Sequence, residues 1–160
     1  MGTENKPKSS ALESVVGANN RFALDLYMQY SSKDENIFFS PYSISTALAM
    51  TYEGAKGKTA NEMKEVFHFP AKKALREGSA KLMADINSGE KDYRLNTANA
   101  LWAEKDYEFI KKYFNTVEKH YGGKVSNMDF KNNYEGERQL INKWVEEKTF
   151  EKIKDLIPQG

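Results

Sequence analysis

The sequence predicts an α+β fold of about six helices and three strands. Two observations carry this prediction. Apolar residues recur at the three-to-four-residue spacing of amphipathic helices through most of the chain, whereas the stretch 93–103 alternates between two faces as a β-strand does. The chain contains no internal repeat and no low-complexity tract. Helices and strands are therefore expected to share one core.

The composition describes a hydrophilic chain that still has enough bulk for a core. Its 160 residues have the length of one ordinary domain, and nine Phe, nine Tyr, two Trp and six Met supply large side chains. The formal charge of +1 provides no field that would attract nucleic acid or an acidic membrane. The absence of cysteine excludes a disulfide-stapled scaffold, a thiolate nucleophile and a Cys-ligated zinc site.

The polar N-terminus is predicted to be a flexible leader over residues 1–14, followed by a single domain segment over residues 15–160. No stretch approaches the roughly 18 apolar residues that a membrane span requires, and no signal peptide is recognisable. Neither a membrane nor a nucleic acid is expected as a partner, and the compartment stays unknown from the sequence.

The first predicted helix runs from Val15 to Tyr30, because its apolar residues fall on one face. Polar residues 31–36 end it, and the β-type run Ile37-Phe38-Phe39 predicts a short buried strand. Pro41 suits the first turn of the next helix, with Ser40 as its N-cap. This helix is apolar nearly all round, which indicates an interior helix that ends between Gly54 and Gly57.

The next two predicted helices are Thr59–Phe67 and Ala71–Ile86, the second interrupted at Gly78-Ser79. A strand follows over 93–103, and its two faces both carry small or apolar groups. Asn99 lies in the middle of this strand, where a polar side chain is disfavoured unless it is paired, so we expect it to brace the sheet.

A helix over Glu108–Tyr121 is predicted to end at Gly122-Gly123, and a strand over Lys124–Phe130 follows. The last predicted helix is Tyr134–Lys148, with a buried stripe made by Leu140, Ile141, Trp144 and Val145.

No catalytic, metal-binding or cofactor-binding residue is predicted. Gly57-Lys58-Thr59 lacks the second glycine of a phosphate-binding loop, because Tyr52 stands at that position and a helix leads into it. His68 and His120 lie in no nucleophile or metal motif. We expect His68 to pack beside its aromatic neighbours and His120 to lie at a helix C-terminus.

Five strings in one order resemble the serpin family. The most specific is Asn36-Ile-Phe-Phe-Ser-Pro-Tyr-Ser-Ile-Ser-Thr-Ala-Leu-Ala-Met50, which is similar to the N-terminal signature of serpins. The other four follow at serpin-like separations: Gly54–Thr59, Thr97–Trp102, Ile141–Val145 and Lys152–Ile157. The resemblance runs from about Asn20 to the last residue. It implies the N-terminal part of a serpin, less than half of a full-length member, with an incomplete main sheet.

The resemblance implies a suicide-substrate inhibitor of a serine or, less often, a cysteine protease. The protease would attack an exposed loop and be trapped when the cleaved loop inserts into the central sheet. That loop belongs to the remainder of the serpin chain, which is the second expected partner. The alternative is a non-inhibitory serpin that acts as a binding, carrier or chaperone-like protein. The family default is extracellular, and intracellular members occur.

The resemblance also assigns roles to residues. Ser40, Pro41 and Ser43 correspond to the serpin shutter, a hydrogen-bonded gate beneath the main sheet; from the residues alone, the two serines are an N-cap and a small core residue. Helix 134–148 would cover the sheet, with Leu140 and Trp144 as sliding contacts.

Two further expectations concern charge and backbone. Lys72, Lys73 and Arg76 share a helix that binds sulfated polysaccharides in some serpins, although three such charges are more often a solvated surface. Glu151 stands where serpins usually have glycine. We therefore expect the exit from the last helix to run differently.

Overall fold

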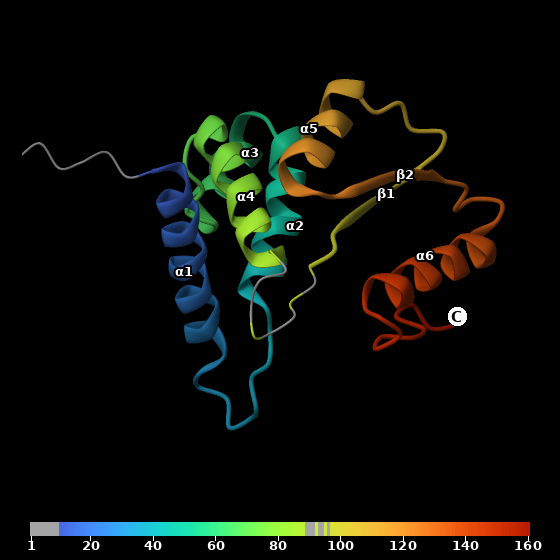
Figure 1. The fold of residues 1–160 in the computed structure, drawn as a ribbon, viewed down its shortest axis with the longest axis horizontal. Coiled ribbons are helices and arrows are strands. Elements are labelled where there is room, and N and C mark those ends of the chain that lie inside the picture. Colours follow the sequence, from blue (N-terminus) through green and yellow to red (C-terminus); the bar gives the residue numbers. More distant parts are fainter. Residues whose placement is uncertain (1–9, 89–91, 93–94, 96) are drawn as a thin grey trace, which may run out of the picture. The chain divides into compact units, whose positions relative to one another are not determined.

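A computed structural model describes residues 10–88, 92, 95 and 97–160 (Figure 1). It divides into two compact units, Met1–Ala84 and Asp85–Gly160. Six helices and a two-stranded sheet lie within the described residues, which confirms the α+β class. None of the described helices is long and apolar enough to cross a membrane.

The first unit contains α1 (Ala11–Tyr30), α2 (Pro41–Gly54), α3 (Gly57–Val66) and most of α4 (Lys72–Asn87). Helix α1 begins four residues before the predicted start, because Ser10 and Glu13 form a capping box. Ala11–Ser14, predicted as part of the leader, are therefore helical. Ser10 is the N-cap of this helix, and residues 1–9 of the predicted leader lie outside the described residues.

The core of the first unit is a chain of aromatic contacts. Phe22 of α1 lies 4.8 Å from Phe67, Phe67 stacks on Phe69 at 5.2 Å, and Phe69 lies 5.2 Å from Tyr52 of α2. Leu75 of α4 is fully buried against this layer. The rings thus join α1, α2 and the end of α3, and their large apolar area makes them the main buried contacts between these helices.

Helix α4 is continuous through Gly78, so the predicted interruption is wrong. A Cβ atom at Gly78 would lie 2.3 Å from the carbonyl oxygen of Ala11 and 2.6 Å from Val15. The glycine is needed here for the close approach of α1 to α4, and not for a break in α4.

The predicted strand Ile37–Phe39 is also wrong, since these residues carry no strand assignment. The segment leads in extended form from α1 to α2, and the side chain of Phe38 is wholly exposed. A strand needs backbone partners as well as β propensity. No other segment in the described part of the chain supplies a ladder to these residues.

The second unit contains β1 (Ala100–Glu104), α5 (Lys111–Tyr121), β2 (Lys124–Met128) and α6 (Tyr134–Lys148). The strands are parallel, with Ala100 opposite Lys124 and Glu104 opposite Met128, and α5 makes the crossover that parallel strands require. Strand β1 begins later than predicted, and residues 93, 94 and 96 of that prediction lie outside the described residues. Gly122 ends α5 at φ 60°, as predicted.

Helix α6 has the predicted bounds and packs on the sheet through Met128 of β2 and its own Ile141 and Val145. Trp144 is half-buried beside them, but Leu140 is 56% exposed, so its predicted burial is wrong. Leu140 lies about 100° around the helix from Ile141. The buried face instead includes two polar residues, Glu137 and Asn142.

Candidate functional site

The start of α2 forms a small hydroxyl cluster. Ser40 is extended at φ −107° and ψ 101°, and its Oγ accepts a hydrogen bond from the Ser43 backbone N–H at 3.3 Å. The two hydroxyl oxygens lie 3.0 Å apart, and Pro41 occupies the first turn. The predicted N-cap is confirmed. Ser43 is exposed in this unit, so the prediction of a core residue is wrong; the buried serine of α2 is Ser45.

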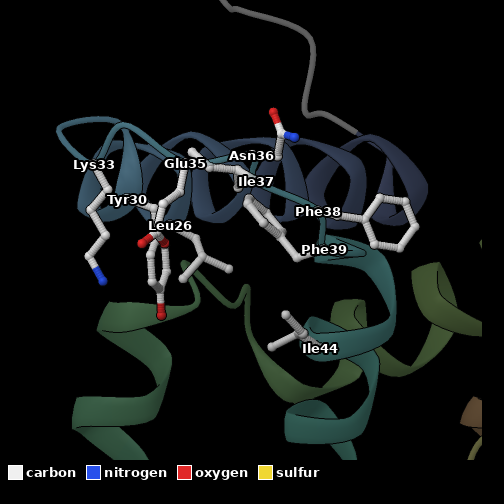
Figure 2. A pocket seen from close by; sticks show the side chains of 9 residues that line it. All are labelled: Leu26, Tyr30, Lys33, Glu35, Asn36, Ile37, Phe38, Phe39 and Ile44. Carbon is white, nitrogen blue, oxygen red and sulfur yellow. The ribbon is translucent and has the colours of Figure 1, made fainter.

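An apolar hollow of about 330 Å³ adjoins this cluster (Figure 2). Phe39 and Ile44, which flank Ser40 and Ser43 in the sequence, both line it, and Figure 2 shows Phe38 pointing away from the other side chains. Lys33, Glu35 and Asn36 add charged and polar groups to its lining. The full lining is Leu26, Tyr30, Lys33, Glu35, Asn36, Ile37, Phe38, Phe39 and Ile44.

Two of the three cations considered for polyanion binding are engaged inside the first unit. The Lys72 ammonium donates to the last carbonyls of α2, at Tyr52 (3.0 Å), Glu53 (3.2 Å) and Ala55 (3.3 Å). Arg76 makes a two-bond ion pair with the buried carboxylate of Glu53. Burial and the nearby carboxylate raise the pKa of Tyr52. Polyanion binding by the trio stays a prediction that draws no support from this geometry.

The remaining cation of that trio, Lys73, is 87% exposed and lies 4.0 Å from Glu77. His68 is paired with α1: its Nε2 lies 2.6 Å from Asp25 Oδ2, and its backbone has φ 54°. Its packing beside the neighbouring phenylalanines stays a prediction. His120 lies in the last turn of α5, as expected. No group of three or more His, Asp or Glu side chains within the described ranges is placed to hold a metal.

Helix α6 contacts the sheet through two tryptophans. The rings of Trp102 on β1 and Trp144 on α6 meet edge to face, with centroids 5.4 Å apart. Asn99 lies just before β1 and not in the middle of a strand. Its backbone carbonyl accepts from the Lys124 N–H at 2.9 Å and so extends the β1–β2 ladder by one bond.

Two ion pairs lie at the opposite end of the sheet. Lys105 pairs with Asp129 at 2.6 Å, which lowers the pKa of the Asp129 carboxyl, and Lys131 pairs with Asp106 at 3.1 Å. Glu137 of α6 accepts from the Asp129 N–H at 3.0 Å. These contacts fix the turn between β2 and α6, and thereby the point from which α6 starts.

Residues 17–159 match the model of one protein family, described as Serpin (serine protease inhibitor). The chain belongs to the serpin family. A serpin-like protein of Methanosarcina acetivorans is 45% identical over 147 residues, which cover 91% of this chain and 34% of the relative. Human leukocyte elastase inhibitor is 38% identical and is covered to 40%, with 93% of this chain aligned.

The fold agrees with solved serpins. Human thyroxine-binding globulin, solved in complex with thyroxine, superposes with a TM-score of 0.80 at 32% identity, over 94% of this chain and 42% of that one. The chain thus spans 34 to 42% of the length of these three proteins. It corresponds to the N-terminal portion of a serpin.

The exit from α6 is left-handed although it contains no glycine. The expectation that its path differs from that of other serpins stays a prediction. The N–H of Glu151 donates to Glu146 at 2.8 Å and that of Phe150 to Glu147 at 3.4 Å, which is a Schellman ending. The left-handed position of this motif is normally glycine. Here Phe150 has φ 52° and Glu151 has φ 61°.

Sequence reasoning missed Asn142, the residue that holds the chain after this exit. Its side-chain amide and carbonyl both bond to the backbone of Ile157, 15 residues downstream. The only available signal was a polar residue between the apolar positions Ile141 and Val145 of a predicted helix. Its partner lies in an irregular segment, whose course no periodicity predicts.

Proposed function

We propose that the full-length protein containing this chain inhibits a serine protease as a suicide substrate, with loop insertion into the main sheet as the trapping step. The observation that carries the proposal is the match to the serpin family over residues 17–159. The similarity to human leukocyte elastase inhibitor favours a serine protease as the target class. In this mechanism the present chain supplies gate and scaffold, and the remainder of the protein supplies the reactive loop.

Ser40, Pro41 and Ser43 are the proposed gate. Pro41 holds the first turn of α2, and the two hydroxyls are already within bonding distance at 3.0 Å. A hydroxyl can exchange one partner for another without a change of charge, so the pair suits an element that must bond in both a closed and an open sheet.

Helix α6 is the proposed cover over the sheet. Trp144 is its contact with β1, through the edge-to-face packing on Trp102. Leu140, exposed at the rim of that face, is proposed as the second sliding contact. Asn99 is proposed to brace the same strand.

The test is covalent capture. The full-length protein is mixed with trypsin-like, elastase-like and subtilisin-like serine proteases, and with a papain-like cysteine protease, and the products are run on a denaturing gel. We expect an SDS-stable complex with at least one serine protease, because the acyl-enzyme is trapped before hydrolysis. Loop cleavage by every protease without any complex would reject the proposal.

The second candidate is a binding or carrier serpin. The similarity to thyroxine-binding globulin, solved with its ligand, favours it specifically. The hinge of the reactive loop separates the two: small residues such as Ala, Thr and Gly allow insertion, whereas proline or bulky charged residues oppose it.

A further inference from the structure

The chain after α6 turns back and lies along that helix. We call residues 150–157 the return segment. Asn142, which is only 6% exposed, holds its far end in two directions: Nδ2 donates to the Ile157 carbonyl at 2.9 Å, and the Ile157 N–H donates to Oδ1 at 2.8 Å. A primary amide in this geometry satisfies both backbone groups of one residue, as a neighbouring strand would.

A second side chain reinforces the attachment. Arg138 Nη1 donates to the same Ile157 carbonyl at 2.6 Å, while its Nε and Nη2 bind both oxygens of Glu135 at 2.8 Å. The Arg138 side chain is only 15% exposed. The guanidinium is therefore fixed before it reaches the return segment, and the Ile157 carbonyl is bound by two pre-positioned donors.

Within this chain, which spans 34 to 42% of the length of the relatives named above, the return segment gains little from apolar burial. Phe150, Ile153, Leu156 and Ile157 are 49%, 44%, 56% and 37% exposed, and every residue of 151–160 is classed as exposed. Beyond the Schellman bonds, its polar attachments include Lys154 to Glu146 at 3.1 Å and the Ile153 N–H to the Thr149 hydroxyl at 3.1 Å. Polar contacts with α6 hold it, and these can be broken one at a time.

The backbone of the return segment opposes this attachment. Phe150, Glu151 and Asp155 have φ values of 52°, 61° and 48°. Left-handed conformations are unfavourable for residues with a Cβ atom, and none of the three is glycine. The segment therefore combines backbone strain with little apolar burial.

We propose that Asn142 is a latch that holds the return segment on α6 against left-handed backbone strain, so that the segment detaches while α6 stays folded. Detachment breaks the bonds at Ile157 and lets residues 150, 151 and 155 return to ordinary conformations. Local opening of this kind is expected where few apolar contacts and strained backbone coincide.

The consequence for inhibition rests on the proposed function. A covering helix must move when the sheet opens, and its downstream connection must give way first or move with it. Release of the latch gives α6 that freedom without unfolding it. Asn142 then acts on the insertion step as a positioning residue, and it does not touch the protease.

The experiment measures amide hydrogen exchange in the full-length protein without any protease, with the Ile157 N–H as the direct reporter of the latch. We expect Asn142→Ala to speed Ile157 exchange by about tenfold, while the Val145 amide inside α6 changes by less than about twofold. Lys143→Ala is the matched control, because Lys143 is the exposed α6 residue next to Asn142 in the sequence.

A second variant tests the strain independently of any loss of folding. Glu151→Gly removes one unfavourable left-handed residue, so Ile157 exchange should slow severalfold. The proposal is overturned if Asn142→Ala leaves Ile157 exchange unchanged, if it accelerates Val145 equally, or if Glu151→Gly fails to slow Ile157. Because no protease is present, these outcomes are separate from failure of the inhibition proposal, which the gel assay reports.

Discussion

Helices α2 and α6 differ in the contacts that hold their two ends. At the start of α2, the Ser40 hydroxyl caps the helix by accepting from the Ser43 N–H. At its end, Lys72 covers three carbonyls and Arg76 neutralises Glu53. Every one of these groups lies in an ordinary backbone conformation.

Helix α6 is held in another way. Asn133 at its start makes no side-chain capping bond, and its end passes through two left-handed residues without glycine. The far end of the return segment is attached to α6 through the side chains of Asn142 and Arg138. The comparison teaches that the end of α2 is held by side chains of α4, whereas the end of α6 is held by contacts with its own continuation, and those contacts can be released.

The largest expected effect is at the end of α2. Arg76→Met leaves the Glu53 carboxylate, 1% exposed, without its guanidinium partner. A buried pair broken on one side costs roughly 3–5 kcal/mol, and partial exposure of Arg76 reduces this to about 2–3 kcal/mol. Urea denaturation of the variant and the parent protein measures it. Lys73→Met, which removes an exposed pair, is the control and should cost less than about 0.5 kcal/mol. Equal losses of stability in the two variants would contradict the conclusion that the Arg76–Glu53 pair anchors the end of α2.

The start of α2 should show the next effect. Ser40→Ala removes the acceptor for the Ser43 N–H and should cost about 1 kcal/mol, whereas Ser40→Asp keeps an acceptor and should cost much less. Thermal melts of both variants test this. If Ser40→Ala is as stable as the parent, Ser40 contributes to the gate only and not to the helix cap.

The end of α6 should respond in the opposite direction. Phe150→Gly and Glu151→Gly each place glycine at a left-handed residue and should stabilise by roughly 0.5–1 kcal/mol. Lys152→Gly, at a position without positive φ, is the control and should not stabilise. Thermal melts again suffice. Loss of stability in both glycine variants would show that the Schellman ending is not strained.

The smallest effect is a pH dependence at the start of α6. Arg138 and Gln139 lower the pKa of Glu135 from 4.5 to about 2. The folded state therefore binds the proton less well than the unfolded state. This stabilisation is complete above about pH 4.5 and is lost as pH falls towards 2. Glu135→Gln should flatten this part of the stability profile, measured by melts between pH 2 and 6. If Glu135→Gln loses stability between pH 4.5 and pH 2 as the parent protein does, the pairing of Glu135 with Arg138 and Gln139 is contradicted.

Local signals in the sequence were enough for much of this structure. The bounds of α6, the Ser40 cap and the Gly122 ending follow from periodicity and from known preferences at helix ends. The lack of glycine at the exit from α6 was visible in the sequence, but the left-handed conformation that Phe150 and Glu151 nevertheless adopt was not predicted.

Features that depend on distant partners were not predictable. Ile37–Phe39 has strand propensity but pairs with no strand in the described part of the chain. Gly78 was expected to break its helix, because the Ala11 carbonyl that requires a glycine there lies 67 positions away in the sequence. Leu140 was expected in the buried stripe, but α6 turns Asn142 and Glu137 inward. The latch at Asn142 depends on the path of an irregular segment, for which the sequence carries no period.

The central claim is that the full-length protein is a metastable serpin whose cleaved loop inserts into its own sheet. The most direct measurement compares the thermal midpoint of the intact protein with that of the protein nicked in its exposed loop. The claim predicts that the nicked protein melts at a clearly higher temperature, because the inserted strand relieves stored strain. An equal or lower midpoint after complete nicking would contradict insertion and would favour the binding serpin.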